Sequence, residues 1–237
     1  MARSWMEQIE VLDLGLAALA MASGVTDVTT FLSLGDVFTS AMTGNTALLG
    51  IALSQGQIVS ATHSLSALLG FALGAALGAA INFRKRRYDV GALQIVRLLL
   101  LMEIGCLGVF AAILSSTGPP PESPVLYALI LLSAIGMGLQ GVVARQINSP
   151  GINTIVFTST VISIVISLIG TFMGSSESRG VHPDTRRQIG IFLAYAFGAI
   201  VAGILTKPAL SLVAWIPMLA VVAGLGCCIA ASGRMSP

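Results

Sequence analysis

The chain has 237 residues, of which 55% are hydrophobic and only 9% charged, with a mean hydropathy of +0.92 and a formal net charge of +2. A soluble domain carries about 25% charged residues to keep its surface in water, so this composition excludes a water-soluble globule. A net charge this small gives no reason to expect nucleic acid or an acidic partner. We therefore expect a multi-pass membrane protein whose solvent is the lipid bilayer.

Apolar runs of about 20 residues without strand-like alternation predict transmembrane helices rather than a β-barrel. We expect an all-α polytopic transmembrane helical bundle that forms a single membrane domain over residues 1–237. The expected number of spans is about eight, within a range of six to eight, because short apolar runs are ambiguous in length. In chain order the expected spans are 12–32, 37–55, 62–82, 95–115, 125–145, 152–172, 189–206 and 209–231.

The last two expected spans are separated only by Thr206-Lys207-Pro208, so they form either a tight hairpin or one interrupted unit. Orientation is not determined by the basic residues. With eight spans and the N-terminus outside, the inner loops hold Arg84, Lys85, Arg86, Arg87, Arg97, Arg145 and Lys207. The outer segments then hold Arg3, Arg179, Arg186, Arg187 and Arg234. This bias is too weak for the positive-inside rule to choose a direction.

The chain shows signs of an internal duplication, with candidate halves 12–115 and 125–231. Asp27 and Gln140 are 113 positions apart, and Thr43 and Thr158 are 115 apart. A stripe of small residues recurs at an offset of 124, as Gly70, Gly74 and Gly78 and then as Ala194, Gly198 and Ala202. Four spans in each half predict a parallel repeat, an arrangement that transporters use alongside inverted repeats. Chance similarity between apolar helices is the alternative.

Two acids lie inside apolar runs, Asp27 in the first and Glu103 in the fourth. A charged side chain at the centre of a bilayer costs about 2.5–3.5 kcal/mol on insertion scales, so such residues face protein, water or an ion. Either acid is a candidate for proton coupling or cation binding. The alternative for Asp27 is a protonated side chain that hydrogen-bonds a neighbouring helix for packing.

A polar block, Thr43-Gly44-Asn45, interrupts the second apolar run. Glycine next to asparagine favours local unwinding, and Thr and Asn side chains can bind a polar solute or satisfy freed backbone groups. The alternative is a helix contact through Gly44 with Asn45 as interhelical glue. Gln140 and Thr158 are the candidate counterparts in the second half, and for these two we favour packing.

The stretch from Gly24 to Gly50, GVTDVTTFLSLGDVFTSAMTGNTALLG, resembles the signature of the DUF1275 (YoaK-like) family of uncharacterised multi-pass membrane proteins. A second resemblance is Gly138-Leu139-Gln140, followed by Arg145 and a threonine-rich segment. At that later site the family often has a Thr-Gly pair, whereas this chain has Thr158-Ser159. The resemblance implies an integral membrane protein and no particular reaction.

Our first hypothesis is a transporter or permease-like protein for a small solute, with candidate binding residues Asp27, Thr43, Gly44, Asn45, Glu103, Gln140 and Thr158. The second is a non-transporting scaffold or accessory subunit that assembles through glycine-rich helix faces, including as a homo-oligomer. An intramembrane enzyme comes third. No catalytic motif, cofactor fingerprint or metal-ligand spacing is present in the sequence, so we expect no enzyme activity, cofactor or metal.

Overall fold

The computed structural model describes residues 2–87, 91–119, 123–147, 161–162, 164–167, 169 and 183–233. These residues form helices and connecting turns without any strand, which confirms the predicted all-α class. The long helices are α1 (Ala2–Ser33), α2 (Met42–Ser54), α3 (Ile58–Arg87), α4 (Ala92–Thr117), α5 (Pro124–Gln146), α7 (Pro183–Val213) and α8 (Ile216–Gly233).

Five helices in the described part of the chain are long and apolar enough to cross a membrane, and Ile216–Ala231 is a shorter apolar helix. The five are Val11–Ser33, Ile58–Arg84, Ala92–Thr117, Pro124–Gln146 and Thr185–Val213. This set agrees with a bundle of six to eight spans. Most of the expected span 152–172, including Thr158, lies outside the described residues.

Of the two alternatives at Thr206–Pro208, the structure shows the interrupted unit rather than the hairpin, because α7 runs through these residues. The helix bends at Ala209, which has non-helical dihedrals (φ −146°, ψ 42°) and follows Pro208. Proline lacks a backbone N–H and its ring clashes with the preceding turn, so it kinks the helix here. A turn at Ala214 and Trp215 then separates α7 from α8.

The expected span 37–55 is wrong, because α2 has only 13 residues. A helix of that length is about 20 Å long. The hydrocarbon core is about 30 Å thick, so α2 does not cross it. The preceding residues, Leu34–Ala41, form a non-helical loop.

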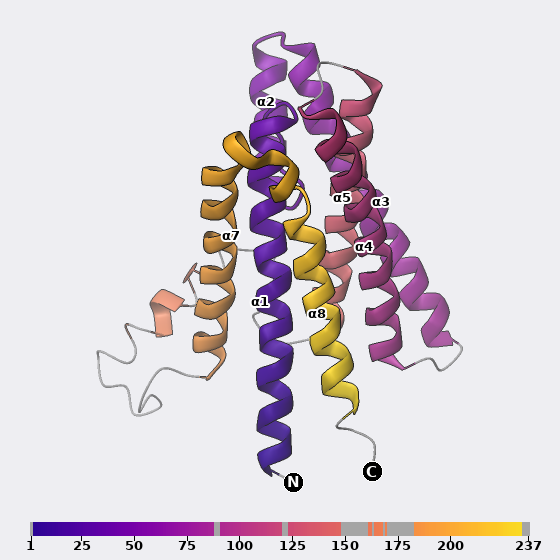
Figure 1. Ribbon diagram of the computed structural model, residues 1–237, viewed down its shortest axis with the longest axis vertical. Coiled ribbons are helices and arrows are strands. Elements are labelled where there is room, and N and C mark those ends of the chain that lie inside the picture. Colours follow the sequence, from indigo (N-terminus) through magenta and orange to yellow (C-terminus); the bar gives the residue numbers. More distant parts are fainter. Residues whose placement is uncertain are drawn as a thin grey trace.

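Helix directions show that the two halves are inverted rather than parallel. In Figure 1, α1 rises from the end of the bundle that holds both termini, whereas α5 descends toward that end. Likewise α3 descends and α7 rises, while α4 rises and α8 descends. The predicted parallel repeat counted α2 as a span. Without that crossing, three helices of the first half traverse the bundle, so the second half begins in the opposite direction.

Close glycine contacts join α1 to α7. A Cβ on Gly24 would collide with the backbone oxygen of Tyr195 and lie 3.1 Å from the nitrogen of Ala199. A Cβ on Gly198 would in turn collide with the backbone oxygen of Met21. The two backbones therefore approach each other only because both positions lack a side chain.

The same contacts recur between α3 and α5. A Cβ on Gly138 would collide with the backbone oxygen of Phe71 and lie 2.8 Å from the nitrogen of Ala75. A Cβ on Gly74 would collide with the backbone oxygen of Ile135. Each α5 position lies 114 residues after its α1 counterpart, and each α7 position lies 124 residues after its α3 counterpart. The pairs α1–α7 and α5–α3 are therefore related by a pseudo-two-fold operation that reverses helix direction.

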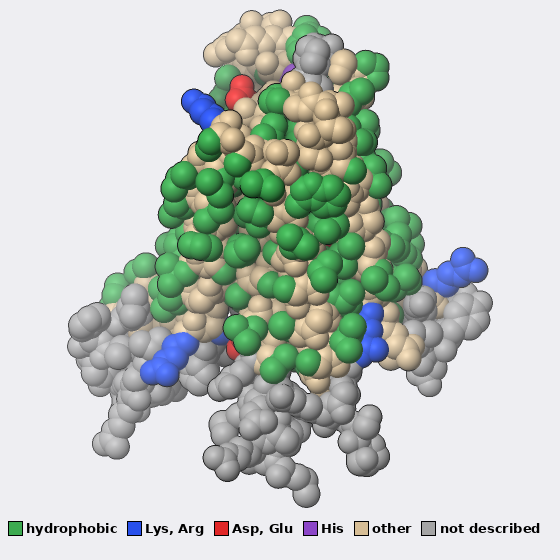
Figure 2. All heavy atoms as spheres, in the orientation of Figure 1, with side chains coloured by type: hydrophobic (Ala, Val, Ile, Leu, Met, Phe, Trp, Pro, Cys, Tyr) green, Lys and Arg blue, Asp and Glu red, His purple; other side chains and the backbone are tan. Residues whose placement is uncertain are grey.

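Positive charge gathers at one end of the bundle. The helix directions place these described basic residues toward the end that holds the termini: Arg84, Arg97, Arg145, Arg186 and Arg187. Lys207 lies near the opposite end, beside the bend of α7. Figure 2 shows the visible face between the two ends covered by hydrophobic side chains. By the positive-inside rule, we expect the basic end and both termini to face the cytoplasm.

Candidate functional site

The loop Leu34–Ala41 turns back along α1 at two residues with left-handed backbone. Gly35 has φ 80° and Asp36 has φ 58°. Glycine adopts this region without steric cost, and aspartate is among the few other residues that tolerate it. Gly35 is also required because a Cβ there would collide with the ring of His63 on α3.

Asp27 holds this loop against α1. Its Oδ1 accepts hydrogen bonds from the backbone N–H groups of Thr39 and Ser40, both at 2.7 Å, and from Thr39 Oγ1 at 3.1 Å. Its Oδ2 accepts from Ser40 Oγ at 2.6 Å and from the hydroxyl of Tyr195 on α7 at 2.9 Å. Asp27 is fully buried. Five donors on one carboxylate are the arrangement that makes a buried negative charge tolerable.

Two further side chains fix the loop on either side of this carboxylate. Thr30 donates from Oγ1 to the carbonyl of Val37 at 3.0 Å. Asn45 of α2 accepts from the N–H of Phe38 at 2.9 Å and donates to its carbonyl at 2.6 Å. The ring of Phe38 stacks on Phe31 with centroids 4.8 Å apart. The loop therefore satisfies its backbone groups with side chains of the helices around it, as non-helical backbone at membrane depth requires.

The Asp27 carboxylate lies near the middle of the bundle. Asp13 pairs with Arg187 near the basic end, and Asp27 lies 14 residues further along α1, about 21 Å of helix. On the other side, α2 starts beside the loop that Asp27 binds and extends about 20 Å to its turn. The interruption between α1 and α2 is therefore at bilayer depth.

The expected break at Thr43–Asn45 is displaced, because these residues lie in the first turn of a regular α2 that begins at Met42. Thr43 is exposed. Gly44 leaves room for the ring of Phe38, which would lie 3.0 Å from a Cβ at this position. The real interruption is the preceding loop, and Asn45 holds it in place.

Sequence reasoning missed the donors that complete the Asp27 site. Tyr195 is 168 positions away, and no sequence pattern connects it to Asp27. Thr39 and Ser40 lie in the family-like stretch, and each binds Asp27 through its backbone N–H group as well as its hydroxyl. The one signal in the sequence that pointed to Thr39 and Ser40 was their place in the same polar stretch as Asp27, Thr30 and Asn45.

Glu103 forms a second buried polar site, on α4. It is fully buried, and neither Oε1 nor Oε2 has a hydrogen-bond partner. The residues of its own helix on either side, including Leu99, Leu100 and Leu107, belong to the main hydrophobic core between α1, α4, α5 and α8. Glu103 therefore differs from Asp27, both of whose carboxyl oxygens have hydrogen-bond partners.

Gln140 on α5 links to α1. Its Nε2 donates to the carbonyl of Leu19 at 3.1 Å and to Ser23 Oγ at 2.7 Å, while Oε1 is buried without a partner. Ser23 Oγ itself donates to the carbonyl of Leu19 at 3.3 Å. Because the carbonyl of Leu19 can only accept, the amide orientation is fixed with Oε1 pointing away from α1.

The sequence candidates therefore form two groups in the structure, with Thr158 outside the described residues. Asp27, Gly44 and Asn45 lie against the α1–α2 loop, and Thr43 is exposed in the first turn of α2. Glu103 and Gln140 belong to the core. The structural offset of 114 also pairs Asp27 with Gly141, so Gln140 is not its counterpart. Among the described residues, no group of three His, Cys, Asp or Glu side chains could hold a metal ion.

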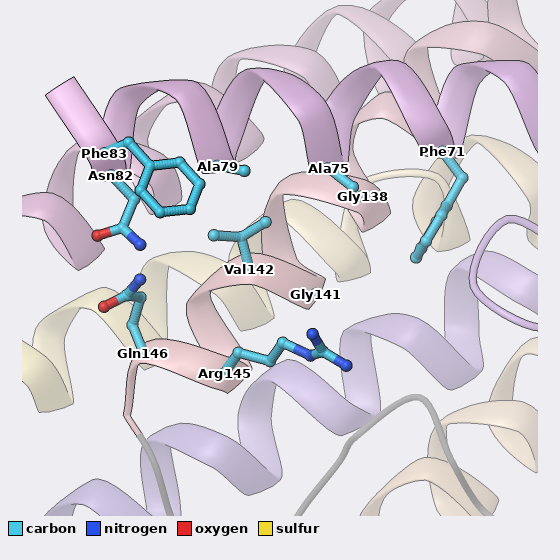
Figure 3. Close-up of a pocket in the computed structure, with 10 residues that line it drawn as sticks. All are labelled: Phe71, Ala75, Ala79, Asn82, Phe83, Gly138, Gly141, Val142, Arg145 and Gln146. Atoms are coloured by element: carbon cyan, nitrogen blue, oxygen red, sulfur yellow. The ribbon is translucent and has the colours of Figure 1, made fainter.

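A pocket of about 440 Å³ lies between α3 and α5. Figure 3 shows Asn82 and Gln146 pointing toward each other at one end, with Arg145 along one edge and Phe71 at the other end. The pocket also includes Gly138, Gly141 and Val142. By the pseudo-two-fold relation, Gly141 occupies the position of Asp27, and Phe71 occupies the position of Tyr195. The pocket is thus the counterpart of the region where Asp27 binds its loop.

Comparison with known proteins identifies the family and one relative of this chain. The family model described as "Protein of unknown function (DUF1275)" matches residues 15–227. The UPF0700 transmembrane protein YoaK of Bacillus subtilis (strain 168) is 30% identical over 203 residues, covering 86% of this chain and 88% of the relative. No solved structure matches the chain. The chain therefore belongs to the DUF1275, YoaK-like family and is a multi-pass integral membrane protein.

Proposed function

We propose that this protein transports a small solute across the membrane. The observation that carries the proposal is the interrupted α1–α2 element at mid-bundle depth, within halves of inverted topology. Many transporters are built from inverted repeats, with sites at the midplane formed by discontinuous helices. Buried polar and ionisable groups at that depth are costly, which is the reason they mark solute and ion pathways.

The Asp27 site supplies the moving part in this proposal. In the present conformation all five donors are taken by the carboxylate of this same chain, so a solute has no access to them. Release of the loop from α1 frees hydroxyl, amide and carboxylate groups together at mid-depth. A polar solute that replaces these hydrogen bonds would stabilise the released state.

Glu103 supplies the coupling carboxylate. It is the acid in the described helices with both oxygens buried and without a partner. Gln140 lies in the same core and contacts α1, the helix that carries Asp27.

The test is a thermal-shift screen of the full-length protein in detergent against pools of sugars, amino acids, nucleosides, carboxylates and inorganic ions at several pH values. A solute that binds only the folded state raises its apparent stability by mass action. Hits are then tested for uptake into proteoliposomes. We expect a stabilising solute whose uptake is lost when Gly35 is replaced by Val, which blocks the turn and the approach of His63.

A folded protein with no stabilising solute and no uptake from any pool would overturn this proposal in favour of the scaffold hypothesis. The glycine stripe of α3 gives that hypothesis no specific support. Gly70, Gly74 and Gly78 all pack against α5 of the same chain. A homo-oligomer, if formed, would need other faces.

A further inference from the structure

We propose that Glu103 and Gln140 form a proton-binding pair that connects α4, α5 and α1. The inference deepens the proposed function, because it names the coupling ion and the groups that sense it. It begins with three oxygens, Glu103 Oε1, Glu103 Oε2 and Gln140 Oε1, which are buried without donors in the described structure. All three are acceptors, so the group they lack is a donor.

Helix register brings these oxygens to the same level. Helices α4 and α5 are antiparallel, and Gly136 of α5 lies opposite Cys106 and Leu107 of α4, with its ideal Cβ 3.6 Å from the Leu107 side chain. Gln140 lies one helical turn after Gly136 on α5. Glu103 lies one helical turn before Leu107 on α4. Because the two helices are antiparallel, both steps lead in the same direction along the bundle. Residues four apart lie on one helix face, so Glu103 and Gln140 occupy the same face and level of this contact.

A single proton on Glu103 pairs two of these three oxygens. Protonated Glu103 is neutral, which removes the cost of a buried charge, and its O–H donates to Gln140 Oε1. The amide cannot turn to help an ionised Glu103, because both hydrogens of Nε2 are used by Leu19 and Ser23. When Glu103 loses its proton to water, two acceptors face each other and the connection from α4 through Gln140 to α1 is broken. No other bond changes in this step.

Other titratable groups do not account for the unpartnered oxygens. The described helices packed on α4 are α3, α5, α7 and α8. Together with α4, the titratable side chains that the structure describes on them are His63, Arg84, Arg97, Cys106, Tyr127, Arg145, Arg186, Arg187, Tyr195, Lys207, Cys227 and Cys228. Of these described groups, Cys106, one turn further along α4, interacts electrostatically with Glu103. A thiol does not supply a countercharge.

Infrared spectroscopy of the full-length protein in nanodiscs tests the pair directly. We expect a band from a protonated carboxyl group at neutral pH, which is lost in Glu103→Gln and retained in the matched control Asp27→Asn. In Gln140→Leu the band should move to higher frequency, since the carboxyl group loses its acceptor. A wild-type spectrum identical to that of Glu103→Gln at neutral pH would overturn the proposal, and an unmoved band in Gln140→Leu would overturn the pairing.

Thermal unfolding across pH gives a second readout that does not need Gln140→Leu to fold. Glu103→Gln keeps the shape of the neutral acid but cannot ionise. As the pH rises, the melting temperature of the wild type should therefore fall relative to that of Glu103→Gln. A difference in melting temperature that stays constant with pH would contradict the proposal. Neither readout requires a solute. If the carboxyl band is present but no solute is transported, this inference stands and the transport proposal fails. If a solute binds but the carboxyl band is absent, the transport proposal stands and this inference fails.

Discussion

The pairs α1–α7 and α5–α3 share a backbone arrangement but differ in side-chain chemistry. Both cross through two glycines, Gly24 with Gly198 and Gly138 with Gly74. At the polar centre, however, one pair has Asp27 bonded to Tyr195, and the other has Gly141 and Phe71 at the corresponding positions. The first holds a loop and the second borders a pocket.

The two helix pairs also differ in side-chain chemistry near one end of their contact. The ion pair between Asp13 and Arg187 corresponds to the ring contact between Tyr127 and His63, whose centroids are 5.4 Å apart. Packing is therefore retained in both pairs, while the acids Asp13 and Asp27 belong only to the α1–α7 pair. The comparison teaches that glycines maintain the inverted architecture and that Asp13, Asp27 and their partners on α7 distinguish the α1–α7 pair from the α5–α3 pair.

Replacing Asp27 by Leu should have the largest effect. The change leaves two buried N–H groups and three hydroxyls without their acceptor, and each unsatisfied buried group costs about 1–3 kcal/mol. We expect little folded protein by size-exclusion chromatography. Asp27→Asn is the matched control, because its Oδ1 still accepts from the loop and its Nδ2 can donate to the two hydroxyls on the other side. Equal yields of the Leu and Asn variants would contradict the role of Asp27 in holding the loop.

The glycine contacts should respond equally in the α1–α7 pair and the α5–α3 pair. Gly24→Ala and Gly138→Ala each push a Cβ into the backbone of the partner helix, and such overpacking costs about 1–3 kcal/mol or more. We expect similar losses of melting temperature for the two variants. Gly105→Ala, where a Cβ meets nothing within 4 Å, is the control and should lose none. Strongly unequal losses would argue against the pseudo-two-fold relation.

Tyr195→Phe gives the α1–α7 pair the residue that the α5–α3 pair has at the corresponding position, and it should have the smallest effect. It removes one of the five hydrogen bonds to Asp27, a loss of about 1 kcal/mol. A small decrease in melting temperature, with the protein still folded, is the expected result of thermal unfolding. The reciprocal Phe71→Tyr introduces a hydroxyl beside a pocket without an acid at the Asp27 position, so it should give no gain. A loss in Tyr195→Phe as large as that in Asp27→Leu would show that the tyrosine, not the carboxylate, holds the loop.

Much of the fold could be predicted from the sequence, because apolar run length and composition directly reflect the bilayer. The small-residue offset of 124 between α3 and α7 also matches the contacts of Gly74 and Gly198. The direction of the second half could not be predicted. Residues 37–55 are apolar enough to be counted as a span, and only the hydrogen bonds of Asp27 reveal that the chain folds back before α2 begins.

The candidate site was predictable as a set of residue types but not as a geometry. Asp27, Asn45, Glu103 and Gln140 were identified because polar groups are costly in an apolar run, and all four are buried. Sequence spacing does not show which of them find partners. That depends on contacts such as Tyr195 with Asp27, which the fold brings together across most of the chain.

Site-directed cysteine labelling tests most directly the claim that α2 does not cross and that the halves are inverted. In a background lacking Cys106, Cys227 and Cys228, single cysteines replace Ser4, Gln57 and Gly91, and a membrane-impermeant maleimide is added to intact or permeabilised cells. The account predicts that Ser4→Cys and Gly91→Cys react only after permeabilisation, because α1 begins and α3 ends at the same basic end, and that Gln57→Cys reacts in intact cells. Reaction of Ser4→Cys and Gly91→Cys from opposite sides would mean that α2 spans the membrane and would contradict the inverted arrangement.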